Sequence, residues 1–217
     1  MRSLNLPKIY IRAAIMCSVA ALLGGCSVFQ PVKSESITTY SLEVQFDSLT
    51  KGTGDKTLLV TPLTAQPGFD STRMIYIKKL HEIDYFAQNK WVDTPSRMLT
   101  PLLVQALESS AKYRAVVNSR SSVSADLRLD TEIIRLQQEF LTRPSQIRLT
   151  MRAQLIDIQG RRVLATREFD LTEVAASDDP YGGVVSANRA IKTMLLQIAE
   201  FCTQELKPDT KGNTQVE

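Results

Sequence analysis

The most regular alternation of apolar and polar residues lies at residues 147–155. Apolar side chains occupy every second position there, and Arg, Thr or Gln occupies the positions between them, which is the period of a strand with one buried face. Residues 163–171 carry a second apolar run after a Gln159-Gly160 turn signal. The two runs therefore predict a long antiparallel hairpin.

Several further strands are predicted upstream of this hairpin. Residues 125–133 also alternate, and the pattern then changes phase, so we expect a strand with a bulge near Ile133 and Ile134. Shorter strands are predicted from β-branched, aromatic or apolar runs at residues 37–46, 57–61, 73–77, 82–86 and 114–117. The third and fourth of these short runs are close enough in sequence to form a hairpin.

Two segments have the spacing of amphipathic helices. The first follows Thr94 or Ser96 and the second follows Asp178 or Asp179, which are residue types that commonly cap a helix, and each has a proline near its start. The expected buried stripes are Met98, Leu99, Leu102, Leu103, Ala106 and Leu107 in the first helix, and Ala187, Ala190, Ile191, Met194, Leu195, Ile198 and Cys202 in the second. The pattern predicts an α+β fold, a mixed, mostly antiparallel sheet with two amphipathic helices packed on one face.

The beginning of the chain has the features of an export signal. Three basic residues precede an uncharged, mostly apolar stretch at residues 13–25, which has about the length of a signal-peptide core and is too short to span a bilayer comfortably. The stretch leads into Leu23-Gly24-Gly25-Cys26, which resembles the bacterial lipobox. We therefore expect cleavage before Cys26 and a diacylglycerol on its thiol, which makes Cys26 the predicted lipidation site and the membrane anchor.

This expectation divides the chain into four parts. Residues 1–25 are the predicted signal peptide, residues 26–36 a lipidated tether, residues 37–206 one folded domain, and residues 207–217 a polar, disordered tail. Ser27 follows the lipidated cysteine, whereas an aspartate there resembles the inner-membrane retention signal of enteric bacteria. By this analogy we expect the protein on the periplasmic face of the outer membrane.

Composition excludes several classes of function. Hydrophobic residues make up 43% of the chain and charged residues 23%, as in an ordinary soluble domain. The formal net charge is +3 and the basic residues are scattered, so no surface for nucleic acid is indicated.

Cys17 leaves with the signal peptide and Cys26 carries lipid, so only Cys202 remains as a thiol and no disulfide forms within the mature chain. Its place on a helical stripe indicates a buried side chain.

No set of residues predicts catalysis. His81 is the one histidine, which excludes a histidine-rich metal site, and no Gly-x-Ser-x-Gly motif accompanies it. Asp178 and Asp179 form an acidic pair, for which helix capping is the simpler interpretation. The chain has no glycine-rich phosphate loop. We therefore expect a protein that is not an enzyme and has no cofactor and no metal.

Six short segments form a combination that is more specific than any one of them. They are Tyr40-Ser41-Leu42, Leu59-Val60-Thr61-Pro62, Phe69–Tyr76, Glu82–Phe86, Trp91–Pro95 and Ser186-Ala187-Asn188. In this combination the chain from about Thr39 to Leu206 resembles the ABC-type transport auxiliary lipoprotein family, which includes the paraquat-inducible protein C lipoproteins. It departs from the family pattern at Phe69, at Ser71-Thr72 and at Val92-Asp93.

The resemblance implies a non-catalytic subunit of a lipid-transport system. Such systems join an inner-membrane ATPase and permease to a protein with mammalian-cell-entry (MCE) domains that spans the periplasm. The chain would dock or receive the outer end of the MCE protein, and ring-forming relatives imply a homo-oligomer. An envelope-assembly lipoprotein acting in lipopolysaccharide or outer-membrane biogenesis stays open as an alternative, and a lipid hydrolase is a more distant one.

Three aromatic residues are the predicted contacts with partners. They are Tyr76, Tyr85 and Trp91, because aromatic side chains often anchor interfaces. In the competing interpretation both tyrosines belong to the core or to cross-strand pairs, and Trp91 staples the first helix to the sheet.

Overall fold

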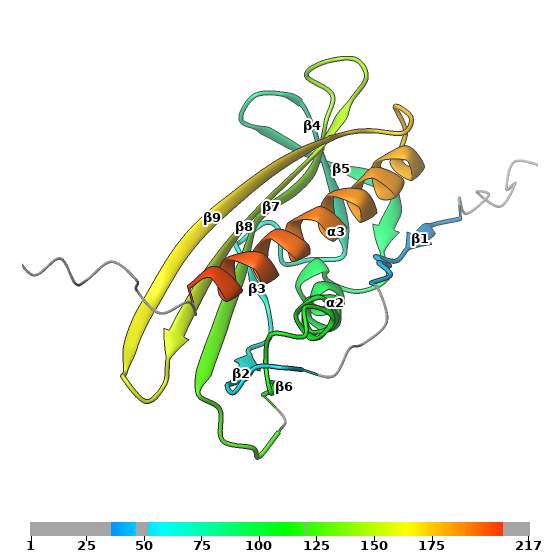
Figure 1. Ribbon diagram of the computed structural model, residues 1–217. Coiled ribbons are helices and arrows are strands. Elements are labelled where there is room, and N and C mark those ends of the chain that lie inside the picture. Colours follow the sequence, from blue (N-terminus) through cyan, green and yellow to red (C-terminus); the bar gives the residue numbers. More distant parts are fainter. Residues whose placement is uncertain (1–35, 47–51, 120, 206–217) are drawn as a thin grey trace, which may run out of the picture. The chain divides into compact units, whose positions relative to one another are not determined.

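Nine strands form one sheet in the computed structural model, which describes residues 36–46, 52–119 and 121–205 (Figure 1). The predicted signal peptide, Cys26 and the predicted tail lie outside these residues. The strands are β1 (Thr38–Tyr40), β2 (Thr57–Val60), β3 (Thr64–Ala65), β4 (Arg73–Lys79), β5 (Glu82–Trp91), β6 (Ala115–Asn118), β7 (Leu127–Glu139), β8 (Gln146–Asp157) and β9 (Arg162–Val174). The helices of this part of the chain are α2 (Pro95–Ser109) and α3 (Pro180–Gln204).

Strand β7, which has 13 residues, organises the sheet. Along one edge it pairs in parallel with β2 at its start, with β3 near its middle and with β4 at its end. Its other edge pairs antiparallel with β8, which in turn pairs antiparallel with β9. Beyond β2 lies β6, and beyond β4 lie β5 and then β1. The longest ladders are antiparallel, so the prediction of a mixed, mostly antiparallel sheet is confirmed.

The strands with the strongest periodicity are the ones that the sequence predicted best. The long hairpin is formed by β8 and β9, and the register between β7 and β8 shifts between Ile133 and Arg135, where the apolar pattern changes phase. The strand predicted at residues 37–46 is shorter, because only β1 is paired there. Leu42 and Val44 are nevertheless buried. An extended segment that packs its apolar residues without pairing has the same pattern as a strand.

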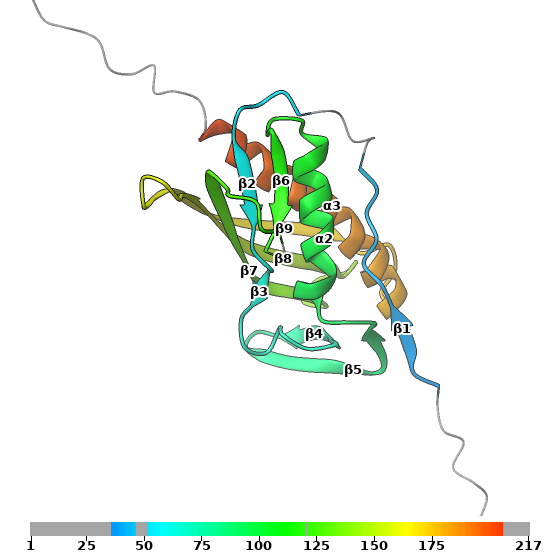
Figure 2. The same ribbon diagram turned by 90° about the horizontal axis from the view of Figure 1, so that it is seen from below.

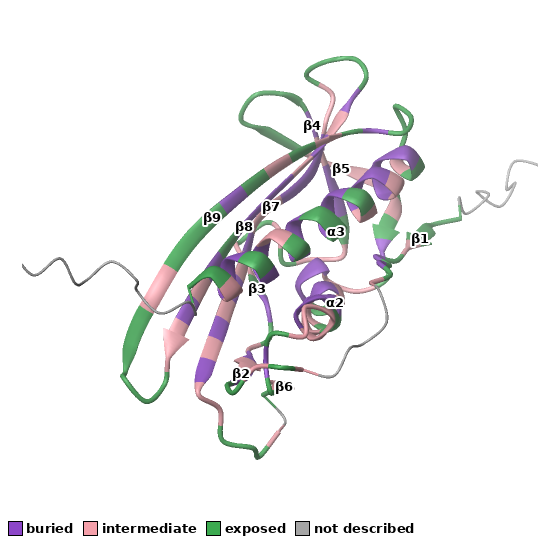
Figure 3. Ribbon diagram, viewed as in Figure 1, coloured by how far each residue is buried: buried purple, intermediate pink, exposed green. Residues whose placement is uncertain are grey.

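Both helices cover the same face of the sheet, and the core lies between the two layers (Figures 1 and 3). Helix α3 crosses β8 and β9, and α2 packs beside β6 and β3. The predicted stripes are buried except at Met98, which is half-buried at the margin of the core. Within the residues that the structure describes, no helix has the combined length and apolar character needed to cross a membrane.

The two helices begin differently. The carboxylate of Asp179 accepts a hydrogen bond of 2.7 Å from the backbone N–H of Gly182, so Asp179, not Asp178, caps α3. The carboxylate of Asp178 accepts a hydrogen bond of 2.6 Å from the N–H of Ser145 and so ties the start of α3 to the β7–β8 loop. Thr94 precedes α2 as its N-cap residue, but its side chain makes no capping bond.

The opposite face of the β7–β9 meander is polar. Arg148 pairs with Asp170 at 2.7 Å, and Arg152 pairs with Glu132 and Glu168 on the strands at either side. The hydrogen bond from Arg148 holds the pKa of the Asp170 carboxyl below its usual range. These side chains are all partly exposed, so this face is solvated and the apolar residues of the meander point to the helices.

Candidate functional site

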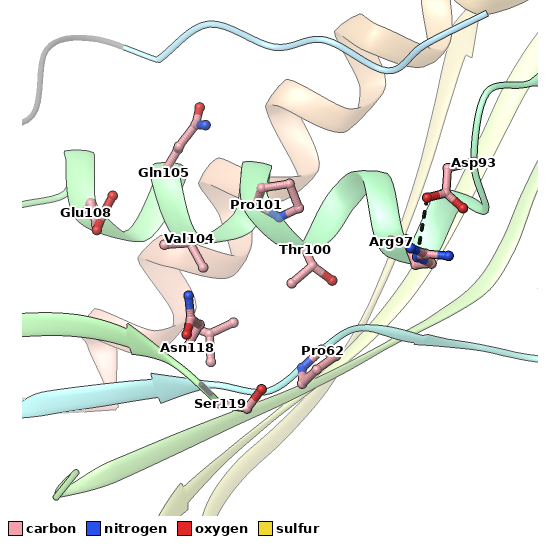
Figure 4. A pocket seen from close by; sticks show the side chains of 11 residues that line it. Pro62, Asp93, Arg97, Thr100, Pro101, Val104, Gln105, Glu108, Asn118 and Ser119 are labelled. Carbon is pink, nitrogen blue, oxygen red and sulfur yellow. Dashed lines mark ion pairs between the residues drawn. The ribbon is translucent and has the colours of Figure 1, made fainter. Parts of the chain in front are cut away.

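A groove of about 690 Å³ lies between α2 and the ends of β2 and β6 (Figure 4). It has more than twice the volume of the hollows beside Met74, Tyr113, Leu80 and Phe201. One wall is a stripe of α2 side chains, and the other is formed by residues at or just after the ends of the two strands. Its main lining residues are Val60, Pro62, Arg97, Thr100, Pro101, Val104, Glu108, Asn118 and Ser119. Several of these are apolar or small, so the groove offers mixed rather than strongly charged contacts.

The helical wall of the groove follows from the spacing of the α2 sequence. Arg97, Pro101, Val104 and Glu108 are separated by four, three and four residues, which places them on one side of a helix. This stripe runs beside the buried one, so the helix packs against the core along one side and borders the groove along the next. Thr100 ties the helix to the segment between β2 and β3, because its hydroxyl accepts a hydrogen bond of 3.1 Å from the N–H of Leu63.

Charge in the groove is limited to its two ends. Asp93 and Arg97 form an exposed ion pair of 3.3 Å at one end, as Figure 4 shows. Glu108 lies at the other end, where it makes no ion pair with a described residue. Exposed pairs stabilise a fold by about 0–1 kcal/mol, so the pair of Asp93 and Arg97 defines the chemistry of the groove more than it supports the helix.

The three aromatic residues predicted to contact partners do not form one surface. Tyr85 lies opposite Ile75 in the β4–β5 pair, whereas Tyr76 lies opposite Asp84, so the two tyrosines project to opposite faces of the hairpin. Trp91 is only 5% exposed and belongs to the core, as the stapling interpretation expects. A partner contact at these three positions stays a prediction.

Tyr76 belongs to an aromatic cluster that is partly exposed. Its ring centre lies 4.6 Å from that of Phe86 and 5.9 Å from that of Phe140, and the amino group of Lys78 lies 5.0 Å from its centre. On the other face of the hairpin, the guanidinium group of Arg73 stacks on Tyr85 at 3.7 Å. Both tyrosines therefore have neighbours within the chain that hold them in place.

The side chains that could suggest catalysis lie in a turn, at the start of a helix or in the core, and each position has a structural explanation. His81 lies in the β4–β5 turn with a φ of 67°, and Asp178 and Asp179 bind backbone N–H groups at the start of α3. Cys202 is fully buried, and burial raises the pKa of its thiol to about 12, so it is protonated at neutral pH. In the part of the chain that is described, no group of three or more His, Cys, Asp or Glu side chains could hold a metal ion.

Sequence reasoning missed the groove. Its helical wall has the pattern of an ordinary solvated side of α2. Its other wall combines Val60 and Pro62, which are far away in sequence, with Asn118 and Ser119 at the end of the next strand. The one signal available was Pro101, a residue that removes an N–H from the hydrogen-bond ladder of a helix and is unusual beyond its first turn.

Comparison with known structures shows that the fold is shared. The crystal structure of protein XCC0632 from Xanthomonas campestris superposes with a TM-score of 0.69 at 20% sequence identity, covering 77% of this chain and 96% of that one. A second crystal structure, of an uncharacterized protein, gives a TM-score of 0.60 at 14% identity, with 80% and 100% of the two chains covered. No curated protein sequence gives a match.

A protein-family model matches residues 40–199, which is most of the chain and nearly all of the described domain. The family is described as the ABC-type transport auxiliary lipoprotein component. This match confirms the resemblance that was noted in the six short segments. The chain belongs to the family of ABC-type transport auxiliary lipoprotein components.

Proposed function

We propose that this protein is a non-catalytic subunit of an MCE-type lipid transporter, anchored on the periplasmic face of the outer membrane. The observation that carries the proposal is the family match over residues 40–199, since it assigns nearly the whole folded domain to an auxiliary role in ABC-type transport. An auxiliary subunit leaves nucleotide hydrolysis and membrane passage to other subunits of the system. The task left to this domain is contact with those subunits.

The predicted lipid on Cys26 supports a docking role. It confines the domain to the plane of a membrane, which raises its effective concentration for a partner that reaches the same plane. Ten residues, 27–36, separate Cys26 from Ile37. A chain of that length spans at most about 35 Å, so the domain stays close to the bilayer surface. In this role the domain receives the outer end of the MCE protein.

The test is recovery of partners from native membranes. Full-length protein with a C-terminal tag is expressed in its own cells, and complexes are purified after mild detergent solubilisation. We expect an MCE-domain protein to co-purify with its permease and ATPase. A Cys202→Ala variant, which changes a buried thiol that cannot contact a partner, is the matched control and should recover the same partners. Recovery of lipopolysaccharide-assembly or other biogenesis proteins without an MCE protein would overturn the proposal.

A further inference from the structure

The β4–β5 turn and the β7–β8 loop lie side by side at one end of the sheet. Strand β7 pairs in parallel with β4 there, and the N–H of Phe140 donates a hydrogen bond of 2.8 Å to the carbonyl of Ile77. Figure 1 shows both loops at the end of the sheet that lies opposite the β8–β9 turn. We call residues 78–83 and 141–144 the two tips. Every residue of the tips is exposed (Figure 3).

The tips carry large apolar side chains that the fold does not bury. Leu80 is 65% exposed, Ile83 48% and Leu141 40%. All three border one hollow of about 300 Å³ and therefore lie close together. None of them belongs to the hydrophobic core, so packing within the domain does not account for them. Exposed apolar side chains that gather in one place mark a surface of interaction.

Aromatic side chains stand directly behind the tips. The rings of Tyr76, Phe86 and Phe140 form one cluster, in which the ring centres lie 4.6–6.4 Å apart. All three residues are half-buried, so each keeps part of its surface in contact with solvent. Tyrosine is enriched at the boundary between lipid headgroups and acyl chains, and phenylalanine and leucine form the apolar side of segments that lie in this boundary.

The charge of the tips favours an anionic surface. Lys78, Lys79 and Arg143 are their cations, and Glu82 is their single carboxylate. Glu82 pairs with Lys79 at 3.8 Å, and the carboxylate of Asp178 is near enough to Arg143 for their charges to interact. A modest net positive charge remains even with Asp178 included. The cores of protein interfaces are depleted in lysine, whereas segments on membrane surfaces combine lysine or arginine with apolar side chains.

The start of the domain lies within reach of the same surface. Thr38 of β1 pairs with Asn89 of β5, and Figure 2 shows β1 beside this end of β5. Asn89 is seven residues after Glu82, so Thr38 lies no more than about 25 Å from the β4–β5 tip along the strand. Residues 27–36 span up to about 35 Å. A lipid on Cys26 therefore allows the tips to touch the bilayer that holds it.

We propose that the two tips insert into the surface of the bilayer that holds the Cys26 anchor. Leu80, Ile83 and Leu141 enter the boundary between headgroups and acyl chains, and Lys78 and the rest of the tips' cations face anionic headgroups. A lipid anchor alone leaves the domain free to rotate, whereas this second contact fixes its orientation and directs the β8–β9 turn away from the membrane. The contact goes beyond the docking function proposed above and rests on it only for the anchor.

The first experiment measures the depth of single positions in the bilayer. Full-length lipidated protein is reconstituted into vesicles of phosphatidylethanolamine with about one phosphatidylglycerol in four lipids. An environment-sensitive fluorophore is attached to Leu80→Cys or, as the matched control, to Val163→Cys. Val163 is 52% exposed near the β8–β9 turn, at the other end of the sheet. Cys202 is buried, so the unchanged lipidated protein should take up no label.

Lipids with a nitroxide on the acyl chain supply the readout. We expect them to quench the label at Leu80 at least about twice as strongly as the label at Val163. Thermal unfolding of the two labelled proteins should match that of the unchanged protein, since both positions are exposed. Equal quenching at the two positions would leave the tips in water, free for a protein partner, and would overturn the proposal.

The second experiment tests the contribution of charge. Lys78→Glu combined with Lys79→Glu should lower quenching at Leu80 by about half or more in these vesicles, because anionic headgroups repel the new carboxylates. Lys112→Glu combined with Lys192→Glu changes the net charge equally at exposed positions outside the tips and should have no effect. In vesicles of phosphatidylcholine alone, the two double variants should behave alike. Equal quenching of both double variants in the anionic vesicles overturns the contact between the tips and anionic headgroups.

These measurements separate the contact of the tips from the proposed function, because the vesicles contain no transporter subunit. Stronger quenching at Leu80 without recovery of an MCE protein from membranes rejects the proposed function alone. Recovery of the MCE protein without stronger quenching at Leu80 rejects the contact of the tips alone.

Discussion

At the residue scale, the start of α3 shows how single side chains set the position of an element. Asp179 caps the helix through the N–H of Gly182, and the cap was predictable from residue type and the proline that follows. The two glycines of the first turn were not explained by sequence, since glycine weakens a helix. A Cβ at Gly182 would collide with the main chain of Ser177, and one at Gly183 with the buried amide of Gln138. Close packing that involves distant residues leaves no local pattern.

Replacement of the capping residue gives a first prediction. Asp179→Ala should lower the free energy of unfolding at pH 7 by about 1 kcal/mol, because the N–H of Gly182 loses its acceptor. Asp179→Asn is the matched control, since asparagine also caps helices, and should stay within a few tenths of a kcal/mol of the unchanged protein. Urea titrations of the three proteins provide the measurement. Equal losses in both variants would show that the capping bond is not the source of stability.

The same residue predicts a dependence on pH. The hydrogen bond from Gly182 holds the pKa of the Asp179 carboxyl below its ordinary value. A carboxyl with a lower pKa in the folded protein contributes stability that is complete above the unfolded pKa of about 3.9 and is lost as the pH falls through the folded pKa. The stability gap between the unchanged protein and Asp179→Ala should therefore narrow below about pH 4. The gap between Asp179→Asn and Asp179→Ala should not change, and urea titrations from pH 7 to pH 3 compare the two.

At the element scale, predictability followed the strength of the local period. The buried stripe of α3 and the alternation in β7, β8 and β9 each extend over enough residues to be recognised without tertiary information. Strand β3 has two residues, too few for a recognisable alternation of apolar and polar positions. It forms because its main chain pairs with β7. The groove also results from packing between elements, because its shape depends on the angle between α2 and β6. The features that could not be predicted from the sequence, β3 and the groove, are therefore determined by packing between elements.

Two adjacent leucines of α3 test the position of its buried stripe. Leu195 is fully buried in the core and Leu196 is 45% exposed, so the same substitution has different effects at consecutive positions. Leu195→Ala should lower the free energy of unfolding by about 2–5 kcal/mol through lost burial and a residual cavity. Leu196→Ala should cost less than about 1 kcal/mol. Denaturant titrations measure both, and similar values for the two variants would contradict the packing of α3 described above.

At the scale of the whole molecule, the family was predictable because its motifs are spread over the entire domain. Segments from Tyr40 to Asn188 pointed to one family, and the family match covers residues 40–199. The site was far less predictable. The partner side chains that would define it belong to other proteins, so only the part of the surface that this chain contributes is encoded here.

The expected lipid anchor on Cys26 gives a fourth prediction, which concerns the full chain. Cys26→Ala removes the only thiol that the lipobox-like motif can present for lipidation, so we expect the membrane-bound fraction after carbonate washing to fall about tenfold or more. Cys17→Ala is the matched control, since it changes a cysteine in the predicted signal peptide that receives no lipid, and it should fractionate like the unchanged protein. An unaltered membrane fraction for Cys26→Ala would reject the anchor.

The central place of β7 has a consequence for how such a protein is made. Leu58 of β2 pairs with Leu127 of β7, and Tyr76 of β4 pairs with Gln138, so the first half of the domain depends on partners that come much later in the chain. In a polypeptide that is exported from its N-terminus, these early strands emerge with apolar side chains and unpaired edges. On the expected export route, completion of these strands waits until β7 has also crossed the membrane. We therefore expect chaperones that bind extended apolar segments to be needed most during this interval, because the domain is most open to aggregation and proteolysis before β7 is available for pairing.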